Sequence, residues 1–303
     1  MFPLSAVLGL CPGAVVSLVG AGGKTSLLFA LVREAVERWG AGCVLVTTTA
    51  RMFHPDRADF PPLPGQDGAV GASHRPAGAP AGAPVPPVRT LLCGTLGEAL
   101  AGVERTLEGA VPVLAQGLLP PSGGLRAKLL GVPAAWVDEI AGRFRRLLIL
   151  VEADGSAGRP LKAPAGHEPV IPSSTGTVVA VAGVDALGAP LDPFHVHRPE
   201  QVARLTGLLS GEAVTPRAMA QVLWHPEGCG KGRPPGSRLV PVLNKVDSPE
   251  RLGAARRVAA DLLGLGAPLV VLTTCRKWPV VVEVVGAGGG LFPGTHGAGG
   301  GLP

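Results

Sequence analysis

Apolar residues along this chain gather in short runs that alternate with segments of helical spacing. The first run, residues 15–19, leads into a glycine-rich turn, and residues 26–39 then place leucines and valines on one helix face. Residues 43–46 form a second apolar run. We therefore expect a strand, a turn, a helix and a second strand, which is the start of a parallel βαβ unit.

The same alternation continues beyond this unit. Apolar runs predict further strands at residues 88–93, 111–116, 147–151, 177–181, 239–243 and 268–272. Helical spacing predicts helices around residues 134–143, 199–209, 216–224 and 249–263. This order is typical of an α/β fold with a doubly wound, mostly parallel sheet and helices on both faces. Ligands bind such sheets at the carboxyl ends of the strands.

Three stretches interrupt the pattern, and one of them, residues 226–237, is a Pro- and Gly-rich segment similar to the insertion described next. Residues 60–87 are dominated by Pro, Gly and Ala and lack periodicity, which predicts a mobile insertion. Residues 286–303 are rich in glycine, and we expect them to form a flexible tail. Residues 1–285 are expected to form a single domain around the sheet.

The turn after the first strand reads GxGGKT, a shortened variant of the phosphate-binding P-loop. Gly22 and Gly23 let the backbone approach oxygen atoms closely, while Lys24 would reach the β- and γ-phosphates. The simpler alternative is a glycine turn that only links strand to helix. We expect a P-loop NTPase-like domain that binds a nucleoside triphosphate, GTP or ATP, through Gly20, Gly22, Gly23, Lys24, Thr25 and Ser26.

Two carboxylates end the apolar run of residues 147–151. Glu152 and Asp154 are two positions apart, so on an extended strand both side chains point to the same side. Acids beside a phosphate loop can hold Mg²⁺ and polarise an attacking water. We expect Thr25 and Asp154 to hold the metal and Glu152 to orient water, which makes Lys24, Glu152 and Asp154 the catalytic set. The alternative is a pair of solvated acids at a strand end.

Thr47, Thr48 and Thr49 end the second predicted strand. One hydroxyl, preferably that of Thr48 or Thr49, could contact the metal or the γ-phosphate, and we include Thr48 in the candidate site. Threonine is also a good strand residue, so β-propensity explains the run equally well.

Asn244, Lys245 and Asp247 follow the predicted strand 239–243 and resemble the NKxD motif with which GTPases bind guanine. In that motif the Asp carboxylate accepts two hydrogen bonds from guanine that adenine cannot donate. The motif therefore favours GTP, although a helix-capping turn at residues 247–249 also fits. Cys275 follows the next predicted strand, beside the expected base site, and is the one cysteine that we would test for reactivity.

Arg159, Lys162 and His167 lie between these motifs and directly follow the carboxylates. They could clamp an anionic substrate. They would be ordinary surface charges if the proline-rich loop that contains them only connects two elements.

Composition argues against several classes of protein. The net charge of +5 is spread along the chain and Tyr is absent, so we expect no nucleic-acid partner. Mean hydropathy is high at +0.35, but prolines and glycines break the long uncharged stretch at residues 1–23. We therefore expect no membrane span and no secretory signal, and we assign the chain to the cytoplasm. The five cysteines contain no CxxC pair, which argues against disulfides and structural zinc.

In combination, these motifs resemble the YqeC-type accessory proteins of selenium-dependent molybdenum hydroxylases. The segments that match are residues 17–25, 46–49, 151–156, 159–164, 167–172, 196–200 and 244–247. The resemblance implies a role in maturing a molybdenum hydroxylase whose cofactor has labile selenium, with that enzyme or its cofactor-maturation proteins as partners. Ala50, where a further polar residue is expected, and the insertion at residues 60–87 depart from the family pattern.

Three activities stay open on the sequence alone. The first is a Mg²⁺-dependent NTPase, with GTP favoured, that drives a maturation step through a conformational cycle. The second is a kinase- or ligase-like phosphoryl transferase acting on a small acid held by Arg159 and Lys162, because the shortened turn resembles the loop of amide ligases. The third is a nucleotide-binding carrier without turnover that delivers selenium or a pterin cofactor.

Overall fold

The computed structural model describes residues 3–55, 88–121, 126–276 and 280–286. Their main feature is a nine-stranded sheet. Its strands are β1 (Val15–Gly20), β2 (Val44–Thr48), β4 (Val88–Leu92), β5 (Val111–Ala115), β8 (Leu148–Glu152), β10 (Thr177–Gly183), β12 (Arg238–Asn244), β13 (Leu269–Thr273) and β14 (Val281–Gly286).

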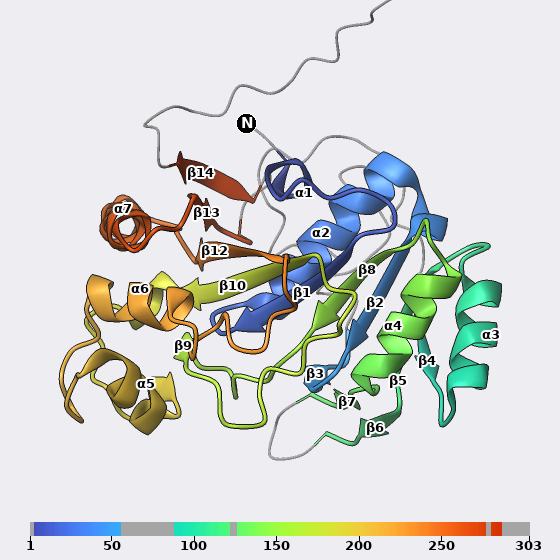
Figure 1. The fold of residues 1–303 in the computed structure, drawn as a ribbon, viewed down its shortest axis with the longest axis horizontal. Coiled ribbons are helices and arrows are strands. Elements are labelled where there is room, and N and C mark those ends of the chain that lie inside the picture. Colours follow the sequence, from blue (N-terminus) through green and yellow to red (C-terminus); the bar gives the residue numbers. More distant parts are fainter. Residues whose placement is uncertain (1–2, 56–87, 122–125, 277–279, 287–303) are drawn as a thin grey trace, which may run out of the picture.

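The spatial order of the strands is β14-β13-β12-β10-β1-β8-β2-β5-β4 (Figure 1). Every neighbouring pair in this sheet is parallel except β13 and β14, which are antiparallel. From β1 the chain continues to β2 on one side of the sheet, whereas from β10 it continues to β12 on the other side. A ligand crevice is expected outside the carboxyl ends of strands at such a change of direction.

Helices cover both faces of the sheet. They are α1 (Leu4–Val7), α2 (Lys24–Trp39), α3 (Leu96–Thr106), α4 (Ala134–Arg143), α5 (Pro199–Thr206), α6 (Pro216–Trp224) and α7 (Pro249–Gly264). Residues of α1 and α2 pack with Val16 and Leu18 of β1 in one core, and residues of α3 to α7 pack with Val15 and Val19 in the other (Figure 1). Because successive strand residues point to opposite faces, one apolar run serves both cores. The predicted α/β class, a P-loop NTPase-like and mostly parallel sheet, is confirmed.

Two small sheets lie near the carboxyl ends of the central strands (Figure 1). One is antiparallel and consists of β3 (Arg51–Phe53), β7 (Lys128–Leu130) and β6 (Gly117–Leu119). The other pairs β9 (Leu161–Lys162) with β11 (Val196–His197). The strands of both small sheets belong to the connections that follow β2, β5, β8 and β10. Both small sheets therefore cover the edge of the central sheet at which ligands are expected.

Most predicted elements are present with shifted ends. Helices α4 and α6 have the predicted bounds, whereas α2 begins at Lys24 because Gly23 is its N-cap, and α5 ends at Thr206 because Gly207 adopts a left-handed conformation. Helix α3 was not predicted, although Thr95 and Glu98 form a capping box at its start. The small sheets and the antiparallel β14 were also not predicted. The predicted insertion at residues 60–87 lies outside the described residues, as does the predicted tail beyond Gly286.

Within the described residues, no helix is both long and apolar enough to cross a membrane.

Candidate phosphate-binding site

The glycine turn lies between β1 and α2, at the carboxyl edge of the sheet. Gly22 has φ +79°, and a Cβ there would overlap the backbone of Gly183 at the end of β10. A Cβ on Gly23, which has φ +113°, would lie 2.5 Å from the Asn244 side-chain nitrogen. Only glycine allows this conformation and this close approach. The turn is therefore tightly enclosed by its neighbours.

Backbone amides of the turn have two kinds of environment. The amide of Ala21 donates to the Val181 carbonyl (2.8 Å), and that of Gly22 donates to the Arg159 carbonyl (3.2 Å). From Lys24 onward the chain is helical, and no side chain caps α2. The first N–H groups of a helix have no partner within it and carry a partial positive charge. They form the donor set that suits a phosphate group.

Lys24 is buried at the start of α2. Its ammonium donates to the Gly20 carbonyl (2.6 Å) and lies 3.1 Å from the Asp154 carboxylate. Burial disfavours the charge, but Asp154 and Glu152 outweigh that effect and raise the pKa of Lys24. Lys24 is thus a buried cation that faces carboxylates from the neighbouring strand.

Thr25 is paired with the other carboxylate. Its hydroxyl donates to Glu152 over 2.7 Å, and burial raises the pKa of Glu152 although Lys24 and this hydrogen bond oppose the rise. We expected Thr25 to share a metal with Asp154, yet in the structure Thr25 contacts Glu152. The reason lies in the strand end: β8 ends at Glu152, and Asp154 comes after it, where it accepts from the Gly20 amide (3.1 and 3.0 Å).

Asp154 also begins a chain of buried charges. Its carboxylate lies 2.9 Å from the ammonium of Lys162, which in turn donates to Glu168 and to the Gly155 carbonyl, both over 2.7 Å. Glu168 then pairs with the guanidinium of Arg198. The Lys162 side chain is fully buried, and its ammonium donates two hydrogen bonds and pairs with the Asp154 carboxylate. Lys162 is therefore not free to bind an anionic substrate in the way that we expected.

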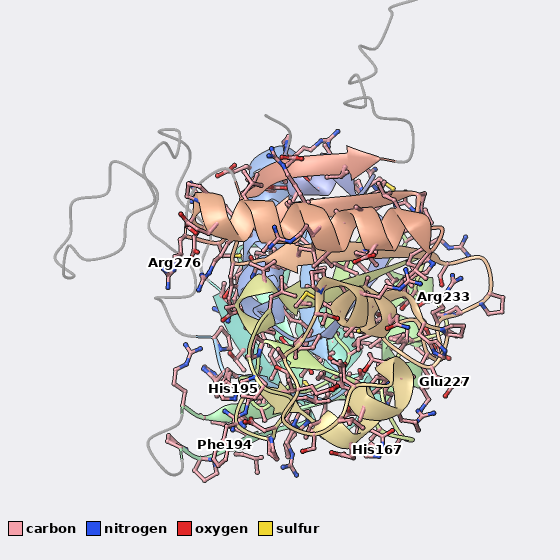
Figure 2. The ribbon with its side chains drawn as sticks, turned by 90° about the vertical axis from the view of Figure 1, so that its left-hand side faces the viewer. His167, Phe194, His195, Glu227, Arg233 and Arg276 are labelled. Carbon is pink, nitrogen blue, oxygen red and sulfur yellow. The ribbon has the colours of Figure 1, made fainter. Side chains whose placement is uncertain are left out.

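The other two expected substrate residues are more exposed. The side chain of His167 is 78% exposed and projects from the surface, with its Nε2 atom 3.9 Å from Glu168 (Figure 2). Arg159 donates from Nε to the Pro193 carbonyl (3.0 Å). The structure thus brings Lys162 to the phosphate loop through Asp154, but it does not bring Arg159, His167 and Lys162 together as one anion clamp.

The three threonines at the end of β2 hold the backbone. Thr48 donates to the carbonyl of Glu152 (2.8 Å), Thr47 to that of Leu114 (2.9 Å) and Thr49 to that of Val170 (2.6 Å). These bonds connect β2 to the segments beside it. If Thr48 donated to a phosphate, that bond would have to replace its bond to Glu152, because the hydroxyl has one hydrogen to donate.

Asn244, at the end of β12, connects the phosphate loop to the next strand. Its side-chain nitrogen donates to the Gly22 carbonyl (2.9 Å), and its oxygen accepts from the Thr273 hydroxyl (3.2 Å). Lys245 has φ +66° and pairs with Asp185 over 2.7 Å. A non-glycine residue in this conformation is strained, and such strain is common at functional sites.

Asp247 lies in the turn that starts α7. Its two oxygens are bound by Arg251 (2.5 Å) and Arg276 (3.2 Å), and Arg276 lies at the surface (Figure 2). The capping turn that we considered as the alternative is also present, because the Ser248 hydroxyl accepts from the Arg251 amide. Asp247 itself is therefore not the cap.

The cysteines beside the site are not activated. Burial raises the pKa of Cys275 to about 12 and that of Cys229 to about 12, so both thiols stay protonated near neutral pH. Among the described residues, no group of three or more His, Cys, Asp or Glu side chains is placed to hold a metal ion.

Sequence reasoning gave no role to Glu168, Arg198 or Asp185. Glu168 and Arg198 both lie in segments that carry the family resemblance, so the sequence contained a signal for these two residues. Their roles became visible only when the fold placed β9 beside β11.

The charge pair at Glu168 leads to a prediction about stability. Burial would raise its pKa, but hydrogen bonds from Arg198 and Lys162 lower the pKa from 4.5 to about 2. Glu168→Gln should therefore cost on the order of 2 kcal/mol of unfolding free energy at pH 7. Glu168 stabilises the fold fully above its unfolded pKa, and this contribution is lost as the pH falls toward about 2. The difference between variant and wild type in urea titrations should shrink over that range.

Glu139→Gln, an exposed carboxylate on α4, serves as the control and should leave stability unchanged at each pH. A Glu168→Gln difference that stays constant from pH 7 to the acid limit would contradict the role of this charge pair.

Comparison with known proteins shows the family of this chain. The sequence model of the family described as "YqeC protein" matches residues 16–200, which include β1, the phosphate loop, β8 and the segments of Lys162, Glu168 and Arg198. The chain is also similar to "Uncharacterized protein YqeC" of Escherichia coli (strain K12), with 35% identity over 269 residues. That alignment covers 89% of this chain and 90% of the relative. The chain belongs to the YqeC family.

Proposed function

We propose that this protein binds a nucleoside triphosphate at residues 20–26 and hydrolyses it with Mg²⁺. One observation supports this most directly. Lys24 and Thr25 are the first two residues of α2, and each contacts a carboxylate at the end of the adjacent strand β8. A cation, a hydroxyl and two acids beside an uncapped helix N-terminus are the groups that phosphoryl transfer requires.

Nucleotide binding would use an exchange of partners at Lys24. The ammonium is now shared between Asp154 and the Gly20 carbonyl, and it would turn to the β- and γ-phosphates. Asp154 would then keep Lys162 and the Gly20 amide as partners. Because the buried carboxylate stays paired, the exchange avoids the large cost of an isolated buried charge.

Thr25 and Glu152 are the residues that would hold Mg²⁺. Both present hard oxygen atoms, which Mg²⁺ prefers, and both lie next to Lys24. When bound, the ion supplies charge neutralisation at the phosphate oxygens. Asp154 would hold the lysine in position between turnovers and would steady the Gly20 amide.

The residues at the expected base site favour GTP. Asn244 ends β12 and Lys245 follows it, in the order of the NKxD motif, and Asn244 bonds both the phosphate loop and Thr273. For guanine to reach Asp247, the base would replace Arg276, whose side chain is 79% exposed and therefore easy to displace. Arg251 could stay, because it contacts the other oxygen.

The proposed biological role rests on the family resemblance. We propose that nucleotide turnover drives a maturation step for a selenium-dependent molybdenum hydroxylase in the cytoplasm. The phosphoryl-transferase alternative has less support, because Lys162 is fully buried and its hydrogens are already bonded within the protein.

The primary experiment compares Mg²⁺-dependent hydrolysis of GTP and ATP by the purified chain. Lys24→Ala should lower nucleotide affinity in calorimetry at least about a hundredfold, because it removes a charged donor to phosphate from a buried site. Lys128→Ala, which removes a cation on β7, is the matched control and should bind normally. Unchanged affinity in Lys24→Ala would refute the proposed site.

Glu152→Gln tests the metal site. It removes the charge that Thr25 contacts, so Mg²⁺ should no longer tighten nucleotide binding, whereas affinity measured in EDTA should be near that of wild type. Glu104→Gln, an exposed carboxylate on α3, is the control. If Mg²⁺ enhances binding equally in Glu152→Gln and wild type, the metal is held elsewhere.

Asp247→Asn tests the choice of base. Loss of the double acceptor should lower GTP affinity roughly tenfold and move the ratio of GTP to ATP affinity toward one. Asp261→Asn, on α7, should leave the ratio unchanged. A wild-type ratio in Asp247→Asn would show that this carboxylate only anchors Arg251 and Arg276.

A further inference from the structure

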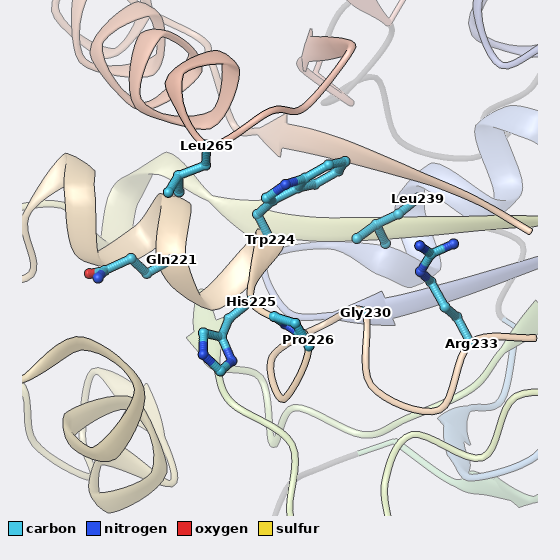
Figure 3. A pocket seen from close by; sticks show the side chains of 8 residues that line it. All are labelled: Gln221, Trp224, His225, Pro226, Gly230, Arg233, Leu239 and Leu265. Carbon is cyan, nitrogen blue, oxygen red and sulfur yellow. The ribbon is translucent and has the colours of Figure 1, made fainter. Parts of the chain in front are cut away.

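A pocket lies away from the phosphate loop, between α6, α7 and the loop that leads into β12 (Figure 3). Its volume is about 540 Å³, within the range of small-molecule sites. Trp224 ends α6, Leu265 follows α7, and Leu239 is the second residue of β12. The pocket therefore opens near the amino end of β12, whereas the phosphate loop lies at the carboxyl end of β1.

The loop that forms one side of this pocket is held in place by its own bonds. The amide of Cys229 donates to the Val222 carbonyl (2.9 Å), and the Ser237 hydroxyl donates to Pro234 (2.6 Å). Between them, the ammonium of Lys231 donates to the carbonyls of Ala165 (2.8 Å) and Gly166 (3.0 Å). Binding to a preformed pocket avoids the entropy cost of ordering a loop.

The lining of the pocket combines a flat apolar wall with positive charge. The Trp224 indole lies with Leu239 and Leu265 along one side, and the Arg233 guanidinium projects from the facing loop (Figure 3). Arg233 donates to the Ser237 carbonyl through one nitrogen, which fixes the direction of the guanidinium. His225 adds an imidazole, whose Nδ1 atom accepts from the Glu227 amide (3.0 Å). Among the described lining residues there is no acid.

We propose that this pocket binds a small planar aromatic anion. The ring would lie against Trp224 and the two leucines, where burial of apolar area favours it. The carboxylate, sulfonate or phosphate group would pair with Arg233, whose planar fork suits such groups. The proposal does not depend on nucleotide hydrolysis and adds a second ligand site to the chain.

Calorimetry with 2-naphthalenesulfonate and its uncharged analogue 2-naphthalenesulfonamide tests this site. Wild type should bind the sulfonate roughly tenfold more tightly than the sulfonamide, as expected for one charged hydrogen-bonded pair. Arg233→Gln should bring the two affinities close to each other. Trp224→Leu should weaken both probes, and Arg257→Gln, which removes an exposed cation on α7, should change neither.

The ratio of the two probes is measured within each variant, so a general loss of folded protein does not imitate the result. The proposal is overturned if wild type shows no saturable binding of the sulfonate, or if Arg233→Gln keeps the wild-type ratio. It is also overturned if Lys24→Ala abolishes sulfonate binding, since the probe would then occupy the phosphate loop.

Discussion

The carboxylate of Asp154 is the constraint on which the site depends. It is 1% exposed, it accepts from the Gly20 amide, and it lies against the ammonium groups of Lys24 and Lys162. A buried carboxylate costs several kcal/mol unless its charge and its lone pairs are matched. The phosphate loop, the segment after β8 and the end of β9 must therefore meet at one point. Loss of any of the three partners would leave Asp154 incompletely paired and would loosen the other two.

Two lysines pair with this one carboxylate, which would allow the exchange of partners proposed for Lys24. With Lys24 as the only cation, its movement toward a phosphate would leave Asp154 bare inside the protein. Lys162 prevents this, and Glu168 with Arg198 in turn balances Lys162. The charge chain therefore reaches from the phosphate loop to β11 and the start of α5. Lys162, which the sequence suggested as part of a clamp for a substrate, is in the fold a partner of the buried Asp154 carboxylate.

The elements around the site could be predicted because each has a local signal. Apolar runs gave β1 and β8, and the glycines with Lys24 gave the turn between strand and helix. The division of roles between Glu152 and Asp154 could not be predicted, because residue spacing shows that both acids face one side but not where β8 ends. The role of Lys162 depends on pairing between β9 and β11, which are two residues long and lie 35 positions apart along the chain. Long-range pairing of such short strands leaves no periodic pattern to detect.

Asn244 gives the strongest reason to treat the glycine turn and residues 244–247 as one site. A helix-capping turn before α7 would need only Ser248 and Pro249. It would not require the buried side-chain amide of Asn244, which lies 222 positions along the chain from Gly22. Instead, the Asn244 side chain bonds the Gly22 carbonyl on one side and the Thr273 hydroxyl on the other. Any ligand that shifts the glycine turn must therefore strain or move the adjacent carboxyl ends of β12 and β13. Because Lys245 is already held at positive φ beside these strand ends, the backbone there stores strain that a change at the turn could relieve or increase.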